Sequence, residues 1–324
     1  MASAWRRANG PIGIDLSEDT VRVVQVAQRR GGLRLVAAGQ ATGPGPDGPA
    51  DLLADAVRDA VDRAGAHGAD CVALVPTAHA QARNLRLPDV PDTELDAAVR
   101  FEAQSSLGGG TVQHFDAGRV GAGADARREV VALAVPDAHA DRWLRALTLA
   151  KLRPRAIDAA PAALARTLHA AGRLDPAPAA EPGADASPAT AGVLELGRNY
   201  AAAHFVQRDR VLFSKSLPAL DTQDLDPGPA TPLIREFALC LRYLLVTFRG
   251  QQPSHLYATG AAEDREPWLR ALAAHTGLDT QPFAGLGQNL ANTGRGWDGA
   301  AAAQWALALG AALRPAHPVS GAAA

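Results

Sequence analysis

Residues 12–26 read IGIDLSEDTVRVVQV, and residues 193–206 read VLELGRNYAAAHFV. In each stretch two apolar runs flank a short polar turn, and an acid, Asp15 or Glu195, ends the first run. This alternation predicts a strand, a tight turn and a second strand. Aligned without a gap, Asp15 lies over Glu195 and Ser17 over Gly197. The repeat indicates that the chain arose by internal duplication.

The same order of elements follows each hairpin. Both hairpins extend into a three-stranded meander and then into helices and strands. The six expected meander strands are Ile12–Leu16, Val21–Val26, Leu33–Ala38, Gly192–Leu196, Tyr200–Gln207 and Val211–Leu217. Apolar spacings of three and four predict helices at Ala50–Ala64, Thr93–Leu107, Ala138–Leu152, Ala162–Ala171, Pro232–Phe248, Pro267–Thr276 and Gln304–Leu313. This order predicts an α/β protein with two lobes around a cleft.

A Pro/Ala-rich segment separates the two halves. Residues 175–190 read DPAPAAEPGADASPAT and have no apolar period, which is typical of a linker. We therefore expect a first lobe over residues 1–174 and a second over residues 191–324.

The composition limits the kinds of partner and the cellular compartment that we expect for this protein. The chain has 324 residues, a net charge of -2 and two cysteines. The charge gives no reason to expect nucleic acid, and the cysteines are too few for a disulfide framework. No apolar run is long enough to span a membrane. We expect a cytoplasmic protein.

Seven segments in order resemble the actin-like ATPases, and within them the PilM-type pilus assembly proteins, which are relatives of the cell-division protein FtsA. The first is IGIDLSEDTVRVVQV, at the place of the phosphate-1 hairpin, and the second is LRLPDVPDTELDAAVRFEAQSSL. The others are VALAVPDAHADRWLRALTLAKLRPRAIDAAPAALAR, VLELGRNYAAAHFVQRDRVLFSKSL at the phosphate-2 hairpin, REFALCLRYLLVTF, HLYATGAAEDREPWLRALAAHTGL and QWALALGAALRP. The resemblance covers nearly the whole chain.

The resemblance implies a duplicated ribonuclease-H-like fold with a small mixed α/β insertion subdomain at about residues 71–120. It implies ATP and a divalent cation, Mg²⁺, in the cleft. It also implies a partner, the short cytoplasmic peptide of a PilN-like inner-membrane protein. The protein would then be peripheral to the inner membrane through that partner.

The predicted nucleotide site departs from the family pattern, so we expect it to be vestigial. Its residues would be Asp15, Ser17, Glu195, Gly197 and Gly260. A serine stands where the phosphate-1 hairpin usually has glycine, and the next two residues are acids that would repel a polyphosphate.

The second lobe is also reduced. Only residues 218–231 connect the last meander strand to the next helix, where the family carries a subdomain that closes over the adenine. These features predict a scaffold with no cofactor and no catalysis. The alternative is a functional actin-like ATPase or sugar-kinase-like enzyme that binds Mg-ATP.

Several residues allow two interpretations. Asp15 can hold a cation through water or cap its own turn, and Glu195 can be a ligand or a solvated acid at a strand end. Asp158 can orient a water in the cleft or cap the helix that follows it. Arg100, Phe101 and Glu102 can form a partner surface or belong to an ordinary packed helix.

No metal site is expected from the sequence. His139 lies in the stretch DAHAD, residues 137–141, without a second histidine at metal-ligand spacing. We therefore interpret this stretch as the exposed start of a helix.

Overall fold

The computed structural model describes residues 9–29, 32–107, 110–174, 189–208, 210–220, 227–248, 251–260, 266–283 and 303–314. Most of the predicted linker, residues 175–188, lies outside these ranges.

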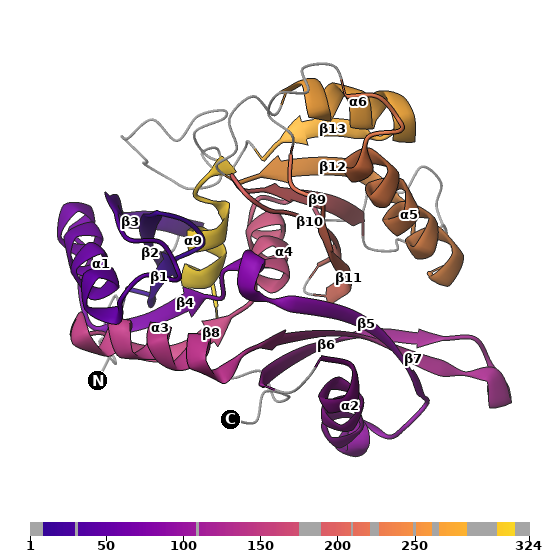
Figure 1. The fold of residues 1–324 in the computed structure, drawn as a ribbon, viewed down its shortest axis with the longest axis horizontal. Helices are drawn as coiled ribbons and strands as arrows, with labels where there is room; N and C mark the ends of the chain where they lie inside the picture. Colours follow the sequence, from indigo (N-terminus) through magenta and orange to yellow (C-terminus); the bar gives the residue numbers. More distant parts are fainter. Residues whose placement is uncertain are drawn as a thin grey trace, which may run out of the picture.

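The first lobe is built on a five-stranded sheet with the order β3-β2-β1-β4-β8 (Figure 1). Its strands are β1 (Ile12–Asp15), β2 (Thr20–Arg29), β3 (Gly32–Thr42), β4 (Asp70–Leu74) and β8 (Arg153–Asp158). The first three strands pair antiparallel, and β4 and β8 continue the sheet in parallel. The predicted first meander is confirmed.

The second lobe repeats this sheet with the order β11-β10-β9-β12-β13. Its strands are β9 (Thr190–Leu196), β10 (Ala201–Gln207), β11 (Arg210–Leu217), β12 (Pro253–Thr259) and β13 (Asp279–Pro282). The register repeats as well. Asp15 is paired with Arg22, and Glu195 is paired with Ala202. Glu195 follows Asp15 in the sequence by the same number of residues as Ala202 follows Arg22. The predicted duplication therefore extends to individual strand pairs.

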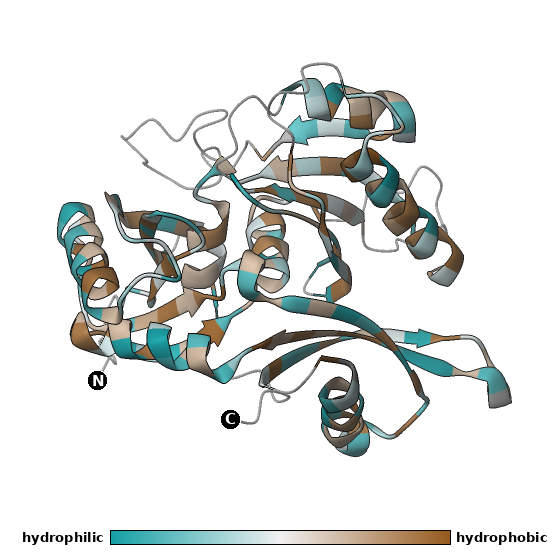
Figure 2. Ribbon diagram, in the orientation of Figure 1, coloured by the Kyte–Doolittle hydropathy of each residue, from teal (hydrophilic) through white to brown (hydrophobic). Residues whose placement is uncertain are grey.

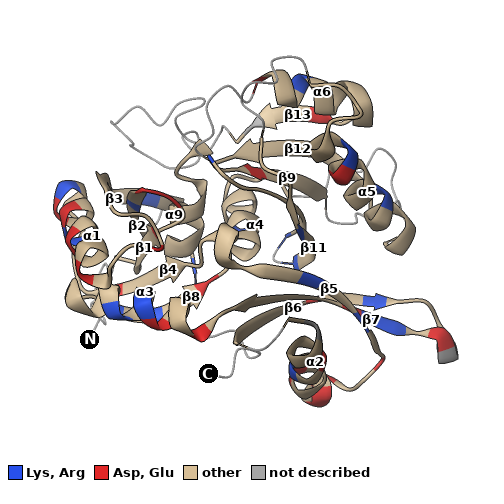
Figure 3. Cartoon of the chain, in the orientation of Figure 1, with Lys and Arg blue, Asp and Glu red and all other residues tan. Residues whose placement is uncertain are grey.

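Two helices of the first lobe, α1 (Ala50–Ala64) and α3 (Asp137–Leu149), pack on its sheet. The buried side of α1 includes Leu53 and Val57, while its hydrophilic residues face outward in Figure 2. Charges of both signs alternate along the outer sides of α1 and α3 (Figure 3). In the second lobe, α5 (Pro232–Thr247) and α6 (Glu266–Thr276) pack against the other sheet.

The helices α4 (Ala160–Ala170) and α9 (Ala306–Ala312) cross between the lobes. Helix α4 contacts β10 and β11 of the second sheet, and α9 contacts β1, β2 and β4 of the first. The packing is close, since a Cβ added to Gly13 would lie 2.1 Å from the Ala308 carbonyl oxygen. The last helix, which we had expected in the second lobe, thus packs on the sheet of the first.

An insertion subdomain follows the short 3-10 helix η1 (Thr77–His79). It consists of β5 (Gln81–Pro88), α2 (Asp92–Leu107), β6 (Thr111–Val120), the 3-10 turn η2 (Gly123–Asp125) and β7 (Arg127–Val135). The strand order is β5-β7-β6, with α2 covering one face.

The predicted bounds of this subdomain, residues 71–120, were wrong at both ends. Cys71 lies in β4 and pairs with Ile12, so the strand belongs to the large sheet. Strand β7, which ends at Val135, is the central strand of the small sheet. The subdomain therefore extends from Gln81 to Val135.

Candidate functional site

The five residues predicted for the nucleotide site lie at the carboxyl ends of three central strands. Asp15 and Ser17 lie at the end of β1, Glu195 and Gly197 at the end of β9, and Gly260 directly after β12. In duplicated α/β folds, ligands bind at this edge of the sheets. The structure thus gathers these residues at the junction between the lobes.

Glu195 is fully buried, and protein groups engage both of its carboxylate oxygens. The hydroxyl of Thr77, in η1 of the first lobe, lies 3.0 Å from Oε1 and 2.9 Å from Oε2. The Tyr200 hydroxyl donates to Oε1 at 2.8 Å, and His204 Nε2 lies 3.2 Å from Oε2. Glu195 is therefore an internal hydrogen-bond acceptor that joins the lobes, rather than a solvated acid.

The hydrogen-bond network of Glu195 extends to the next strand, β11, and the tyrosine in it carries a proton. His204 Nδ1 lies 3.0 Å from the Ser214 hydroxyl on β11. Burial, and after it the charge of Glu195, raises the pKa of Tyr200 well above its usual value. The phenol therefore keeps its proton and remains a donor to the carboxylate.

Asp15 caps its own turn. The backbone N–H of Ser17 donates to Oδ1 at 2.9 Å, and the Ser17 hydroxyl bonds to the same oxygen. Arg22 Nη1 lies 4.0 Å from the other oxygen. Burial raises the pKa of Asp15 in spite of Arg22 and Ser17, which act to lower it. Of the two interpretations for Asp15, the turn cap is the contact present in the structure.

The tips of the two hairpins are bound to each other. The backbone N–H of Arg198 donates to Glu18 Oε1 at 2.9 Å, and Arg198 Nη1 lies 2.7 Å from Asp19 Oδ2. In a phosphate hairpin such backbone N–H groups face the phosphates. Here one of them is taken by a carboxylate of the opposite hairpin.

The space beside this junction is small. A cavity lined by Thr77, His204, Ser214 and Pro161 has a volume of about 10 Å³. A single water needs roughly 10–15 Å³. None of the five residues predicted for the nucleotide site lines this cavity.

The two glycines of the predicted site lie against neighbouring parts of the protein. A Cβ on Gly197 would lie 2.1 Å from the ring of Tyr200. Gly260 has a φ of +103°, and its Cβ would lie 2.2 Å from the Leu196 carbonyl oxygen. Both positions therefore require glycine for packing within the protein.

Asp158 does not cap the helix that follows it. It is fully buried and forms ion pairs with Arg166 of α4 and, at 3.0 Å, with Arg314 beyond α9. Helix α4 has Ala159 at its N-cap position and no side-chain cap. The acid instead joins the two crossing helices.

Sequence reasoning did not identify Thr77, Tyr200, His204 and Ser214. A signal was present for His204, since it is a polar residue in an apolar strand, and strand pairing places it opposite Ser214. No signal pointed to Thr77, because its contact with Glu195 joins segments that are 118 residues apart.

The residues predicted for a partner surface lie elsewhere, on α2. Phe101 is 77% exposed, while Leu95 and Val99 of the same helix are buried against the small sheet. Arg100 Nε donates to Asp96 at 2.8 Å. Glu102 lies in the same helix, next to Phe101.

The insertion subdomain is tied to the second lobe on its other side. The Asn84 side chain of β5 exchanges two hydrogen bonds with the backbone of Ser214, at 3.0 and 3.2 Å. Tyr243 of α5 donates to Glu129 of β7 at 2.9 Å. These contacts hold the subdomain against β11 and α5 and leave α2 on the far face of the small sheet (Figure 1).

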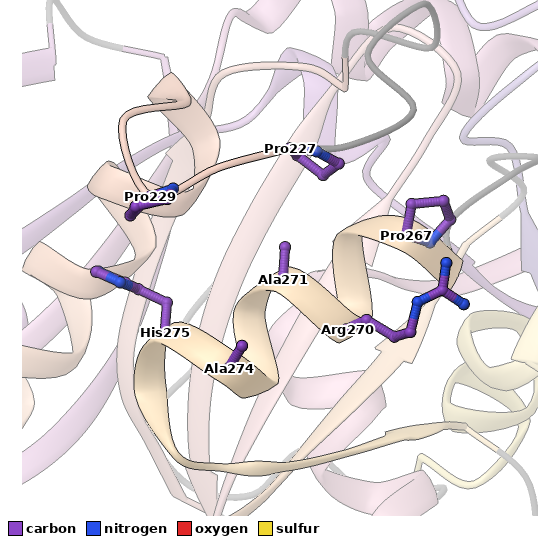
Figure 4. A pocket seen from close by; sticks show the side chains of 7 residues that line it. All are labelled: Pro227, Pro229, Pro267, Arg270, Ala271, Ala274 and His275. Carbon is purple, nitrogen blue, oxygen red and sulfur yellow. The ribbon is translucent and has the colours of Figure 1, made fainter.

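A separate hollow of about 400 Å³ lies on the second lobe, between α6 and the segment before α5 (Figure 4). Its lining residues are Pro227, Pro229, Pro267, Arg270, Ala271, Ala274 and His275. None of the residues predicted from the sequence for a site lines this hollow.

Comparison with solved structures identifies the fold. A chain of a PilM-PilN type IV pilus biogenesis complex superposes with a TM-score of 0.71 over 96% of this chain and 100% of its own, at 19% sequence identity. The chain has the actin-like fold. The ethanolamine utilization protein EutJ from Carboxydothermus hydrogenoformans matches with a TM-score of 0.50 and 11% identity, over 94% of this chain and 89% of its own.

Comparison at the level of sequence gave no relative: no family model and no curated protein matches the chain. The helices in the described ranges include none that is long and apolar enough to cross a membrane.

Proposed function

We propose that this protein is a PilM-like scaffold of type IV pilus assembly that neither hydrolyses nor requires a nucleotide. It would act in the cytoplasm and be held at the inner membrane by the cytoplasmic peptide of a PilN-like partner. The likeness to a chain of the PilM-PilN complex over nearly the whole length supports the pilus role, because it includes the insertion subdomain as well as the two lobes.

The observation that carries the non-catalytic part is the contact between the hairpins. A polyphosphate entering there would have to break the contacts of Arg198 with Glu18 and Asp19 and would then face both freed carboxylates. Two like charges about 5 Å apart repel by roughly one to a few kcal/mol at an effective dielectric constant of 80 to 20. A cation at Glu195 would also compete with Thr77 and Tyr200 for its oxygens.

The peptide would bind in an extended form, with backbone hydrogen bonds and alternate side chains in pockets. The exposed ring of Phe101 offers an apolar anchor, with Arg100 and Glu102 beside it. Aromatic side chains of this kind often carry much of the binding energy of an interface.

Two measurements test the proposal. The first is calorimetry with Mg-ATP on the full chain, where we expect no saturable heat. Micromolar binding that is lost in Asp15→Ala would overturn the proposal and favour the alternative of a nucleotide-binding enzyme.

The second measurement is binding of a synthetic peptide, the N-terminal cytoplasmic segment of a PilN-like protein from the same genome, by fluorescence anisotropy. We expect Phe101→Ser to weaken binding, and Val246→Ser to leave it unchanged. Val246 is a matched control because it is also exposed, at 68%, on a helix of the other lobe. Absence of binding to the unaltered protein would refute the pilus role, and equal loss in both variants would refute the placement on α2.

A further inference from the structure

Three metal-ligating side chains converge in the first lobe, away from the hairpins. Asp47 lies in the connection between β3 and α1, His79 ends η1, and His139 lies in the first turn of α3. One ligand atom of each residue lies within 4.8 Å of those of the other two. The sequence gave no hint of this group, because the two histidines are separated by the whole insertion subdomain.

We propose that Asp47, His79 and His139 bind a divalent transition-metal ion of the zinc class. Two imidazoles and one carboxylate are a ligand set that Zn²⁺ accepts, with a water or a partner side chain in the fourth position. Metal-ligand bonds of about 2.0–2.2 Å in a tetrahedron separate the ligand atoms by roughly 3.3–3.6 Å. The observed separations from Asp47 Oδ1 are 2.9 Å to His79 Nε2 and 3.7 Å to His139 Nδ1, on either side of that value.

The imidazole rings are held in place and short of polar partners. The His79 side chain is 15% exposed and that of His139 26%. The Trp143 ring contacts both, with centroids 5.8 Å from each, and its own N–H donates to the Pro46 carbonyl at 3.1 Å. Within the described part of the chain, Nδ1 of His139 is buried without a hydrogen-bond partner, and it faces Asp47. A cation at this point would give that nitrogen its missing partner.

The charged side chains around the three ligands include one that favours a bound cation and one that opposes it. The Asp47 carboxylate supplies the negative charge of the group, and its Oδ1 faces both histidines. Arg142 Nη1 lies 3.5 Å from the same oxygen and opposes a second cation. Because its side chain is 32% exposed, Arg142 can turn toward solvent when a metal binds.

Metal binding would connect to the interlobe network. His79 and Thr77 belong to the same three-residue helix, and Thr77 contacts Glu195 of the second lobe. An ion that joins η1 to α3 and to the β3–α1 connection would fix the element that presents Thr77. The site is therefore structural in character, and binding would stabilise the folded chain by mass action.

Calorimetry with ZnCl₂ on the full, tag-free chain after treatment with a chelator tests the proposal. We expect one equivalent of Zn²⁺ to bind and His79→Gln, His139→Gln and Asp47→Asn each to lose about a hundredfold or more in affinity. The control is His255→Gln, which removes a histidine whose Nε2 lies 3.7 Å from Asp279 and which belongs to no metal-ligating group among the described residues. This control should bind as the unaltered protein does.

Two further variants sharpen the test. Arg142→Gln should bind Zn²⁺ more tightly, because it removes the opposing charge. Co²⁺ should quench the fluorescence of Trp143, and the quenching should be lost in both His139→Gln and Trp143→Phe.

The proposal fails if the unaltered protein shows no saturable binding of Zn²⁺ or Co²⁺. It also fails if the histidine and aspartate variants bind as tightly as the His255→Gln control. Asp47 is exposed and lies in a loop, so Asp47→Asn retains the fold and remains informative if a histidine variant does not.

Discussion

Replacing Thr77 by valine should weaken the contact between the lobes at the fully buried carboxylate of Glu195. The substitution keeps the shape of the side chain and removes only the hydroxyl, which lies 3.0 and 2.9 Å from the two oxygens of Glu195. Glu195 would then keep Tyr200 and His204 as partners but lose its single contact with η1.

The expected loss follows from the acceptor. A hydrogen bond to a charged group contributes about 1.5–3 kcal/mol, compared with about 0.5–1.5 kcal/mol for one between neutral groups. Thr167→Val is a matched control, because the Thr167 hydroxyl is also buried but bonds to the neutral carbonyls of Ala163 and Ala306, at 3.0 and 2.9 Å. Thr77→Val should therefore reduce the free energy of unfolding by about 1 kcal/mol more than Thr167→Val does.

Urea unfolding followed by circular dichroism at pH 7 measures both losses. Equal slopes of the transitions would show that the variants unfold as the unaltered protein does. A loss in Thr77→Val no larger than that in Thr167→Val would refute the reasoning, because it would mean that Glu195 gains nothing from the first lobe.

Three more predictions concern the hairpins and the second lobe. Arg198→Ala should lower the free energy of unfolding by less than about 1 kcal/mol, since its ion pair with Asp19 is exposed, and the loss should shrink in high salt; a larger, salt-independent loss would contradict this. Burial raises the pKa of Tyr243 from its ordinary value near 10 to about 12, so the folded state keeps a proton that the unfolded state loses, and stability should fall as the pH rises through that window. Tyr243→Phe should fall less over the same range in alkaline unfolding curves, and an unchanged fall would count against the assignment. Gly260→Ala should destabilise the protein more than Gly277→Ala does. Both glycines have a positive φ, but a Cβ at position 260 would lie 2.2 Å from a backbone carbonyl oxygen, whereas position 277 has open space. Similar losses in melting temperature would argue against the close approach.

The sequence was most informative where structure depends on neighbouring residues. The alternation in IGIDLSEDTVRVVQV and in VLELGRNYAAAHFV predicted both hairpins, and their alignment predicted the shared strand register. Side chains along a strand alternate between the two faces of the sheet. A local sequence pattern therefore specifies which residues pair across a hairpin. The grouping of Asp15, Ser17, Glu195 and Gly197 in one site was implied by the resemblance to the actin-like ATPases and not by this local pattern.

Contacts between distant segments were decided by the tertiary structure. The position of β4 beside β1 depends on a parallel pairing across more than fifty residues, and no local pattern distinguishes it from a strand of the insertion. Helix α9 is apolar on many sides, so its sequence predicts burial but not which sheet it packs on; the close fit of Gly13 to Ala308 decides that.

The sequence by itself therefore determined the duplicated α/β units, their meanders and the acids at their strand ends, because these follow from periodicity and turn composition. The tertiary structure decided what those acids contact. Glu195 meets Thr77, and His79 meets His139, only because parallel strand pairing and the crossing helices bring together segments that the chain keeps far apart. Such contacts are set by the packing of the whole molecule, and neither partner carries a sign of the other in its own stretch of sequence.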